Sequence, residues 1–341
     1  MMKKVITFVT VGIFLAVSSG VALADGPELS VGASASYVYD VNSSGGGNSS
    51  LYANQESRDE SFNIDLVQLG VSGATGDVTY GAKIDLGDLT ALAGDSSDGD
   101  IALQEAWISY DAGSVDVTGG RVGTPIGIEV LEPWGNPHIS RSNGWQLQPI
   151  NHDGVTVSGS GGGLDVMIGV VNGFTVSDVS ANDGDDEKGI IASVAGVAGD
   201  IDLSVTGLFT EEGDILDQTV LNAIASAAVA DMDAAVEFTY REDDPDASSS
   251  KEAFNVALYV GSELGNTGVA ARLEYSDDEG INTSLDTEVW SITVTAGWEL
   301  AENVDFRVEY RHDDADDAIF ADGSSTDDAA DVIQAQVVFT N

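Results

Sequence analysis

The sequence predicts an all-β protein, a single transmembrane antiparallel β-barrel of about 16 strands. Apolar and polar residues alternate along many segments, very short turns join these segments in pairs, and longer polar segments separate the pairs. Segment 303–311 (NVDFRVEYR) places Val, Phe and Tyr on one face of a strand and Asp305, Arg307, Glu309 and Arg311 on the other. A sheet that is apolar on one side and charged on the other suits a closed barrel in lipid around a polar lumen.

The N-terminus has the features of a cleavable secretory signal peptide, residues 1–24. Lys3 and Lys4 precede an apolar run over residues 5–17, and Ala22-Leu23-Ala24 is a small-x-small cleavage site. The apolar run is shorter than the roughly 20 residues that a membrane span needs, which disfavours the alternative of an N-terminal anchor. We therefore expect an exported protein in which residues 25–341 form one barrel.

Seven tight turns carry Gly, Asp or Asn at their tips, as hairpins require. They join fourteen strands, and further strands at 28–39 and 332–339 bring the total to sixteen. The turn segments are 74–80, 111–117, 159–166, 197–203, 229–235, 264–270 and 300–306.

The segments between these hairpins are longer and acidic, so we expect short turns on the periplasmic side and long loops outside. The Asp-rich clusters lack the spacing of a calcium-binding loop, which favours a solvated surface and leaves loosely bound divalent ions as the minority alternative. The expected loops include 43–50, 94–100, 182–187, 242–250, 277–286 and 313–331.

Three strand segments have features of their own. Segment 62–71 changes phase near Leu66, which predicts a bulge, with a buried strand as the alternative. Segment 221–229 is rich in Ala, so a short helix remains open. Trp290 and Trp298 share an apolar face eight residues apart and are expected near the two membrane interfaces.

Composition excludes several classes of function. A formal net charge of -46, from 12 basic and 58 acidic residues, excludes a nucleic-acid partner. There is no Cys, and no catalytic or cofactor-binding motif is present, so we expect neither an enzyme nor a cofactor. His138 and His152 lack metal-ligand spacing and are expected to form hydrogen bonds in the loop or lumen, and His312 is expected to be exposed.

The charged residues that alternate with apolar ones are the candidates for lining the lumen. On strands of this kind they face inward, where water can solvate them. They are Lys83, Asp85, Arg272, Glu274, Asp305, Arg307, Glu309 and Arg311.

The third long loop, roughly 123–145, differs from the others because it holds three prolines and several large apolar residues. Such a loop is expected to fold into the lumen and narrow it. Charged side chains at the constriction would either set a transverse field that contacts solutes or pin the loop to the wall; both roles stay open. The candidates are Arg121, Glu129, Glu132, Arg141 and Asp153.

The region around this loop resembles the OmpL-like β-barrel porin family. The resemblance implies an outer-membrane barrel and diffusion of small solutes, without indicating which ones. The residues that carry it are Gly120-Arg121, TPIGIE (124–129), Asn136, SRS (140–142), Pro149, Asp153-Gly154-Val155 and Asn172-Gly173.

The sequence therefore predicts an outer-membrane porin that passes small hydrophilic solutes and ions passively, with a preference for cations. Its partners would be outer-membrane lipid and the permeant solutes, with a homo-oligomer left open. One alternative is a closed barrel that serves as a surface adhesion or structural protein. Another is an exported soluble β protein.

Overall fold

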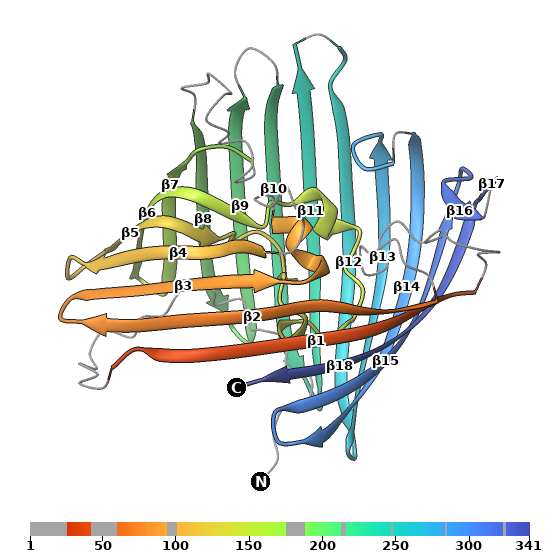
Figure 1. Cartoon of the computed structure of the whole chain (residues 1–341). Coiled ribbons are helices and arrows are strands. Elements are labelled where there is room, and N and C mark those ends of the chain that lie inside the picture. The colour runs from red at the N-terminus through yellow and green to blue at the C-terminus, as the bar shows by residue number, and fades with distance from the viewer. Residues whose placement is uncertain are drawn as a thin grey trace.

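The computed structural model describes residues 26–41, 60–93, 101–174, 188–212, 216–246, 248–283, 285–322 and 325–341. Sixteen of the described strands close into one antiparallel barrel, as predicted. The predicted signal peptide lies outside the described residues. Figure 1 shows β1–β4 running across β10–β12 of the opposite wall, as tilted strands of a barrel do.

The barrel strands follow one another in chain order around the ring. They are β1 (Glu28–Asp40), β2 (Ser61–Thr75), β3 (Val78–Leu86), β4 (Ile101–Asp111), β5 (Asp116–Gly123), β6 (Asn151–Gly161), β7 (Leu164–Val171), β8 (Gly189–Ala198), β9 (Ile201–Glu212), β10 (Leu216–Val229), β11 (Met232–Pro245), β12 (Lys251–Leu264), β13 (Thr267–Glu279), β14 (Asp286–Ala301), β15 (Val304–Ala315) and β18 (Ala329–Thr340). A hairpin, β16 (Phe320–Asp322) and β17 (Ser325–Asp327), and three 3₁₀ helices, η1 (Asp88–Ala93), η2 (Pro133–Gly135) and η3 (Gly144–Leu147), lie outside the ring of pairing.

The ring closes where β1 pairs with β18, so the two ends of the described barrel are neighbours. Ala33 lies opposite Phe339, and Gly32 lies opposite Thr340. The terminal Asn341 continues the pairing, since its Oδ1 accepts a hydrogen bond from the Val31 amide at 2.8 Å. Closure leaves no open sheet edge, which the hydrocarbon of a bilayer would not tolerate.

All seven predicted turns are confirmed as hairpin connections. Gly76 and Asn303 occupy two of them with positive φ of 59° and 64°, a region that favours these residue types. The predicted alternation of short turns with long loops is less regular than expected. Only residues 213–215 separate β9 from β10, and β11 extends through Pro245. Polar strand ends thus keep pairing where a loop was predicted, because antiparallel hydrogen bonds do not require apolar side chains.

The last expected loop, 313–331, is shorter than predicted and partly folded. The inward-facing Asp313 belongs to β15, so it is no part of a loop cluster. Phe320 of β16 is fully buried against Val289, Ala315 and Ala330. The expected cluster at 182–187 lies outside the described residues.

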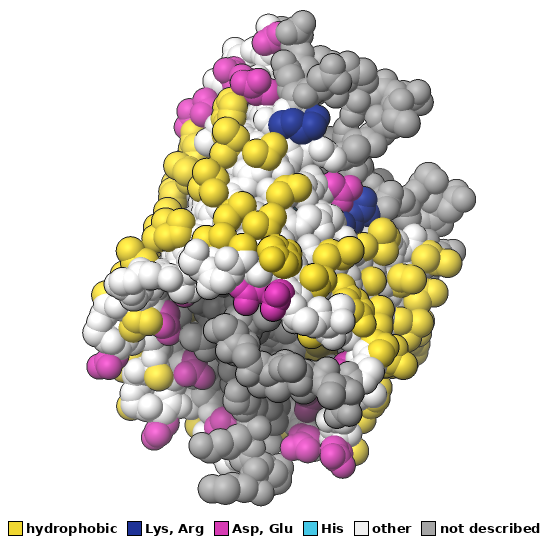
Figure 2. Space-filling view, turned by 90° about the vertical axis from the view of Figure 1, so that its left-hand side faces the viewer, with side chains coloured by type: hydrophobic (Ala, Val, Ile, Leu, Met, Phe, Trp, Pro, Cys, Tyr) yellow, Lys and Arg dark blue, Asp and Glu magenta, His cyan; other side chains and the backbone are white. Residues whose placement is uncertain are grey.

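The barrel has an apolar outside and a polar inside. On β14, Trp290, Ile292 and Val294 are exposed, whereas Ser291 and Thr293 on the alternate positions are buried within the ring. Figure 2 shows hydrophobic side chains gathered over one outer face of the molecule. The two faces expected from the alternation are therefore confirmed.

The structure decides between the alternatives for segments 62–71 and 221–229. The register of β1 against β2 shifts opposite residues 63–66, which confirms the bulge near Leu66. The Ala-rich segment 221–229 is part of β10 and forms no helix. In the described part of the chain, no helix has the length and apolar character needed to cross a membrane.

Candidate pore constriction

The connection between β5 and β6, residues 124–150, turns into the ring of strands, as predicted (Figure 1). Its apolar side chains pack against separate parts of the inner wall. Ile126 contacts inward residues of β7–β10, and Ile128 contacts β10–β12. Leu131 and Trp145 pack against β2, β4 and η1. Burial of these large side chains holds the third loop inside the barrel.

A glycine in the wall allows the loop to approach β1. The ring of Trp134 lies so close to Gly32 that a Cβ added at Gly32 would be 2.2 Å from it. Any other residue at this position would displace the indole. The third loop therefore reaches the wall on the side of β1 as well as on the sides of β2, β4 and β7–β12.

Arg307 of β15 satisfies carbonyl oxygens in the middle of the loop. It donates to Asn136 O at 2.6 Å and to Pro133 O at 2.7 Å. A loop buried inside a barrel cannot form its own sheet hydrogen bonds, so its carbonyl groups need such donors. Arg307 thus acts as a fixed support for the turn around η2.

Two more arginines of the wall hold the segment that follows. Arg272 of β13 donates to Ser140 O at 3.0 Å and to Arg141 O at 3.1 Å. Arg311 of β15 also donates to Arg141 O. Both guanidinium groups are fully buried. They are covered by the loop and do not line an open lumen.

Acidic side chains of the wall bind the loop amides. The carboxylate of Glu309 accepts hydrogen bonds from Ile139 N at 2.6 Å and Ser140 N at 2.8 Å. Glu274 accepts one from Asn143 N at 2.7 Å. Such charge-assisted bonds are stronger than neutral ones. They fix the backbone of the loop to β13 and β15.

Glu129 and Arg141, which belong to the loop itself, also help to hold it in place. One oxygen of Glu129 pairs with Arg272 at 2.6 Å, and the other accepts from Ser142 N at 2.7 Å. Arg141 donates to loop carbonyls and lies over the indole of Trp145, 5.5 Å from its centroid. These two residues are buried, and their contacts are those expected of the pinning role.

Buried charges of both signs surround residues 133–143, which we call the anchored half of the third loop. Buried ion pairs are stable only when each charge has a partner, and removal of one partner costs about 3–5 kcal/mol. Ion pairs join Arg272 to Glu129 and Glu274, and Arg311 to Asp313. Arg141 and Arg307 donate to loop carbonyl groups, and Asp65 and Glu237 are further buried carboxylates of the wall.

The other side of the loop has a different charge arrangement, which we call the Lys83 cluster. The Lys83 Nζ lies 2.7 Å from Glu105 and 2.9 Å from Glu132. The Gln68 amide joins Glu132 to Asp85. Burial alone would raise the pKa of Glu132, but the ammonium of Lys83 and the Gln68 amide hold it below its usual range. Three carboxylates thus surround one ammonium, an acidic excess.

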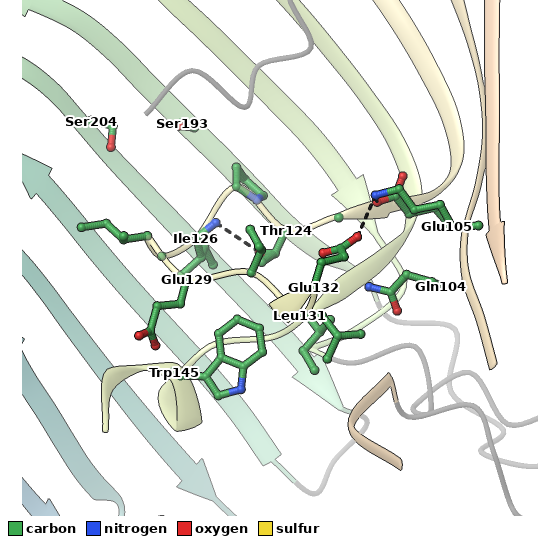
Figure 3. Close-up of a pocket in the computed structure, with 17 residues that line it drawn as sticks. Gln104, Glu105, Thr124, Ile126, Glu129, Leu131, Glu132, Trp145, Ser193 and Ser204 are labelled. Carbon is green, nitrogen blue, oxygen red and sulfur yellow. Dashed lines mark hydrogen bonds and ion pairs between the residues drawn. The ribbon is translucent and has the colours of Figure 1, made fainter. Parts of the chain in front are cut away.

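A cavity of about 150 Å³ lies beside the Lys83 cluster, between the first half of the third loop and the wall. Figure 3 shows Glu105 and Glu132 directed toward one another at one end, and Glu129 pointing away from them. Ser193 of β8 and Ser204 of β9 line the cavity on the other side. This cavity lies beside the anchored half of the loop.

The histidines form hydrogen bonds. His138 is fully buried with Nδ1 2.7 Å from Thr295 Oγ1, and His152 Nε2 is 3.1 Å from Thr124 Oγ1. His312 lies 2.9 Å from Asp331. Among the described residues, no group of three or more His, Asp and Glu side chains could hold a metal ion.

The comparison with protein families agrees with this architecture. A family model described as "putative beta-barrel porin-2, OmpL-like" matches residues 28–340. The chain belongs to this porin family. Among curated protein sequences, none matches this porin.

Solved structures of low identity share the fold of the porin. The OmpT outer membrane protein of Vibrio cholerae lacking loop L8 has a TM-score of 0.66 at 11% identity, covering 93% of this chain and 99% of that chain. An anion-selective porin from Comamonas acidovorans has 0.64 at 13%, with coverage of 93% and 99%. The outer membrane channel DcaP of Acinetobacter baumannii has 0.63 at 14%, with coverage of 92% and 97%. A trimer form of the Vibrio protein also matches.

The structure brings together most of the residues singled out from the sequence, but it sets Arg121 and Asp153 apart from them. Arg121 and Asp153 form a bidentate ion pair at 2.7 and 2.9 Å, but between β5 and β6 on the outer face of the porin. They lie on the same outward rows as Val117 and Val155, which are exposed. Val117 and Arg121 are four residues apart on β5, so the strand alternation already puts Arg121 on the outer face. The ion pair therefore lies outside the constriction.

The sequence did not indicate three residues that lie in or beside the Lys83 cluster: Gln68, Gln104 and Glu105. Glu105 faces inward because the register of β3 against β4 shifts at Gln104, so the two adjacent residues both point into the ring. An inward polar pair flanked by outward Leu103 and Ala106 is the local signal of such a bulge. The pairing of Glu105 with Lys83 depends on strand register, which the sequence does not give.

Proposed function

We propose that this porin allows passive diffusion of small hydrophilic solutes and ions through the outer membrane, along the cavity beside the third loop. The observation that supports this most is the division of the lumen. The anchored half of the loop is packed and hydrogen-bonded to the wall, whereas the first half borders a cavity. Diffusion then needs only this passage and no chemical step.

We also propose a preference for cations. Removal of residues 1–24 takes away two Lys and no acid, so the mature chain carries 12 - 2 = 10 basic and 58 acidic residues, a net charge of -48. The Lys83 cluster has an excess of carboxylates beside the cavity. A negative field at the mouth and at the narrowest part concentrates cations and disfavours anions.

Planar bilayers test the channel. We expect the purified full chain to give discrete current steps in KCl, and a reversal potential in a salt gradient that indicates K⁺ over Cl⁻. The preference should weaken as ionic strength rises, because salt screens the charges. A correctly inserted, heat-modifiable protein that carries no ion current would overturn the channel.

One observation favours the alternative of a closed barrel that acts in surface adhesion or structure. The third loop reaches the wall on nearly every side of the ring and is held by buried arginines. Absence of current in the bilayer measurement would support this alternative. The loops at the outer end would then be the functional part.

We further propose that copies of the porin associate through the wall of short strands. β3, β5 and β7 have 9, 8 and 8 residues, whereas β14 has 16. The outward Arg121–Asp153 pair lies on this wall, and charges facing hydrocarbon cost about 2–4 kcal/mol near the midplane. A second copy against this wall would shield the pair from lipid.

The cysteine-free chain offers a clean test of this surface. We expect Val155→Cys, on the outward row of β6, to cross-link into covalent oligomers with a short bismaleimide in outer membranes. The matched control is Val294→Cys on β14, which is also exposed on the outer face. Equal cross-linking of both variants, or none at Val155→Cys, contradicts the proposed surface.

A further inference from the structure

The cavity beside the third loop has two chemically distinct parts. Figure 3 shows Gln104, Glu105 and Glu132 at one end, while Ile126 and Trp145 lie toward the other. The lining away from the charged end is mostly apolar. A passage for inorganic ions alone would not need such an apolar lining. The apolar contribution comes from Ile126, Ile128, Val130, Leu131, Trp145 and Ile150.

The charged end favours a positive group. Lys83 neutralises one of the three carboxylates of Asp85, Glu105 and Glu132, and the Gln68 amide donates to two of them without adding charge. The remaining negative charge is partly shielded from water, so it interacts more strongly with a cation than a surface carboxylate does. An anion at this position would be repelled.

The size of the cavity limits the apolar part of an occupant. An apolar cavity of about 150 Å³ holds one benzene ring. A metal cation would use the carboxylates and leave the apolar lining unused. A neutral apolar molecule would use the lining and leave the carboxylates without a partner. An ammonium group on a single-ring or short branched body uses both parts.

We propose that this cavity is a binding subsite for small primary organic ammonium ions with an apolar body about the size of one ring. The inference rests on the proposed channel, because it names the class of solute that the passage prefers. The ammonium would lie against Glu105 and Glu132, and the apolar body would lie along the first half of the third loop.

Benzylammonium is a suitable probe, compared with methylammonium, benzyl alcohol and benzoate. Isothermal titration calorimetry on the detergent-purified full chain measures binding without relying on conduction. We expect benzylammonium to bind at least about tenfold more tightly than the other three, since both parts of the cavity contribute. In bilayers carrying KCl current, it should reduce the current reversibly at concentrations where methylammonium does not.

Variants separate the two contributions. Glu132→Gln should weaken binding of benzylammonium by about tenfold. The nearly isosteric Val130→Thr should weaken benzylammonium and leave methylammonium unchanged. Glu302→Gln, an exposed acid in the turn between β14 and β15, is the matched control and should change neither. If Glu132→Gln does not fold, Glu105→Gln replaces it, with heat-modifiability as the check of folding.

The outcomes distinguish this inference from the channel itself. Selective binding of benzylammonium without any ion current would remove the channel and keep the subsite. Ion current with equal binding of benzylammonium, benzyl alcohol and benzoate would keep the channel and overturn the subsite. Unchanged affinity in both glutamate variants would also overturn it.

Discussion

Replacement of Arg272 by Met is expected to release part of the third loop and raise the unitary conductance several-fold. Arg272 pairs with Glu129 at 2.6 Å and with Glu274 at 2.6 Å, and it donates to two carbonyl groups of the loop. Its loss removes the ion-pair partner of two buried carboxylates, which costs about 3–5 kcal/mol. The loop can relieve this cost by moving toward water. Single-channel recording and a thermal melt measure the two consequences.

Arg241→Met is the matched control for this change. Arg241 pairs with Asp243 on its own strand and lies over Phe174, away from the anchored half of the third loop. Its removal should lower stability slightly and leave the conductance unchanged. A conductance of Arg272→Met equal to that of the wild type, in a folded protein, would show that the remaining anchors, such as Arg307 and Glu309, hold the loop without Arg272.

The architecture follows from the sequence because its determinants are local. Turn residues such as Gly76 and Asn303 mark the hairpins, and the alternation around Arg307 and Glu309 assigns faces without knowledge of neighbours. Polar residues at a lipid-facing position are costly, so the inward rows are readable directly. These determinants account for the correct number and order of strands.

The site was only partly predictable because its contacts join residues far apart in the chain. Arg272 and Glu129 are 143 positions apart, and no local pattern pairs them. The sequence showed that the third loop is apolar. It did not show that the charged side chains of the wall would form hydrogen bonds to the backbone of this loop. Arg272, Arg307 and Arg311 were expected to line open water, and the structure places them beneath the loop because its carbonyl groups need donors.

The Lys83 cluster leads to the second large effect, a loss of the preference for cations. In the double variant Glu105→Gln, Glu132→Gln, both carboxylates that contact Lys83 become neutral while the ammonium remains. Asp85 then balances Lys83, and the local excess of negative charge disappears. We expect the reversal potential in a KCl gradient to fall toward zero, with the largest change at low salt.

Glu129→Gln separates the field of the cluster from the total charge of the loop. Glu129 also lines the cavity, but its two oxygens are occupied by Arg272 and the Ser142 amide. Its neutralisation should lower the thermal stability of the porin and leave the reversal potential nearly unchanged. If Glu129→Gln shifts selectivity as much as the double variant does, ions sense the acidity of the whole lumen. If only the double variant shifts it, the permeating ion passes within about one Debye length of Glu105 and Glu132, roughly 10 Å at 0.1 M salt.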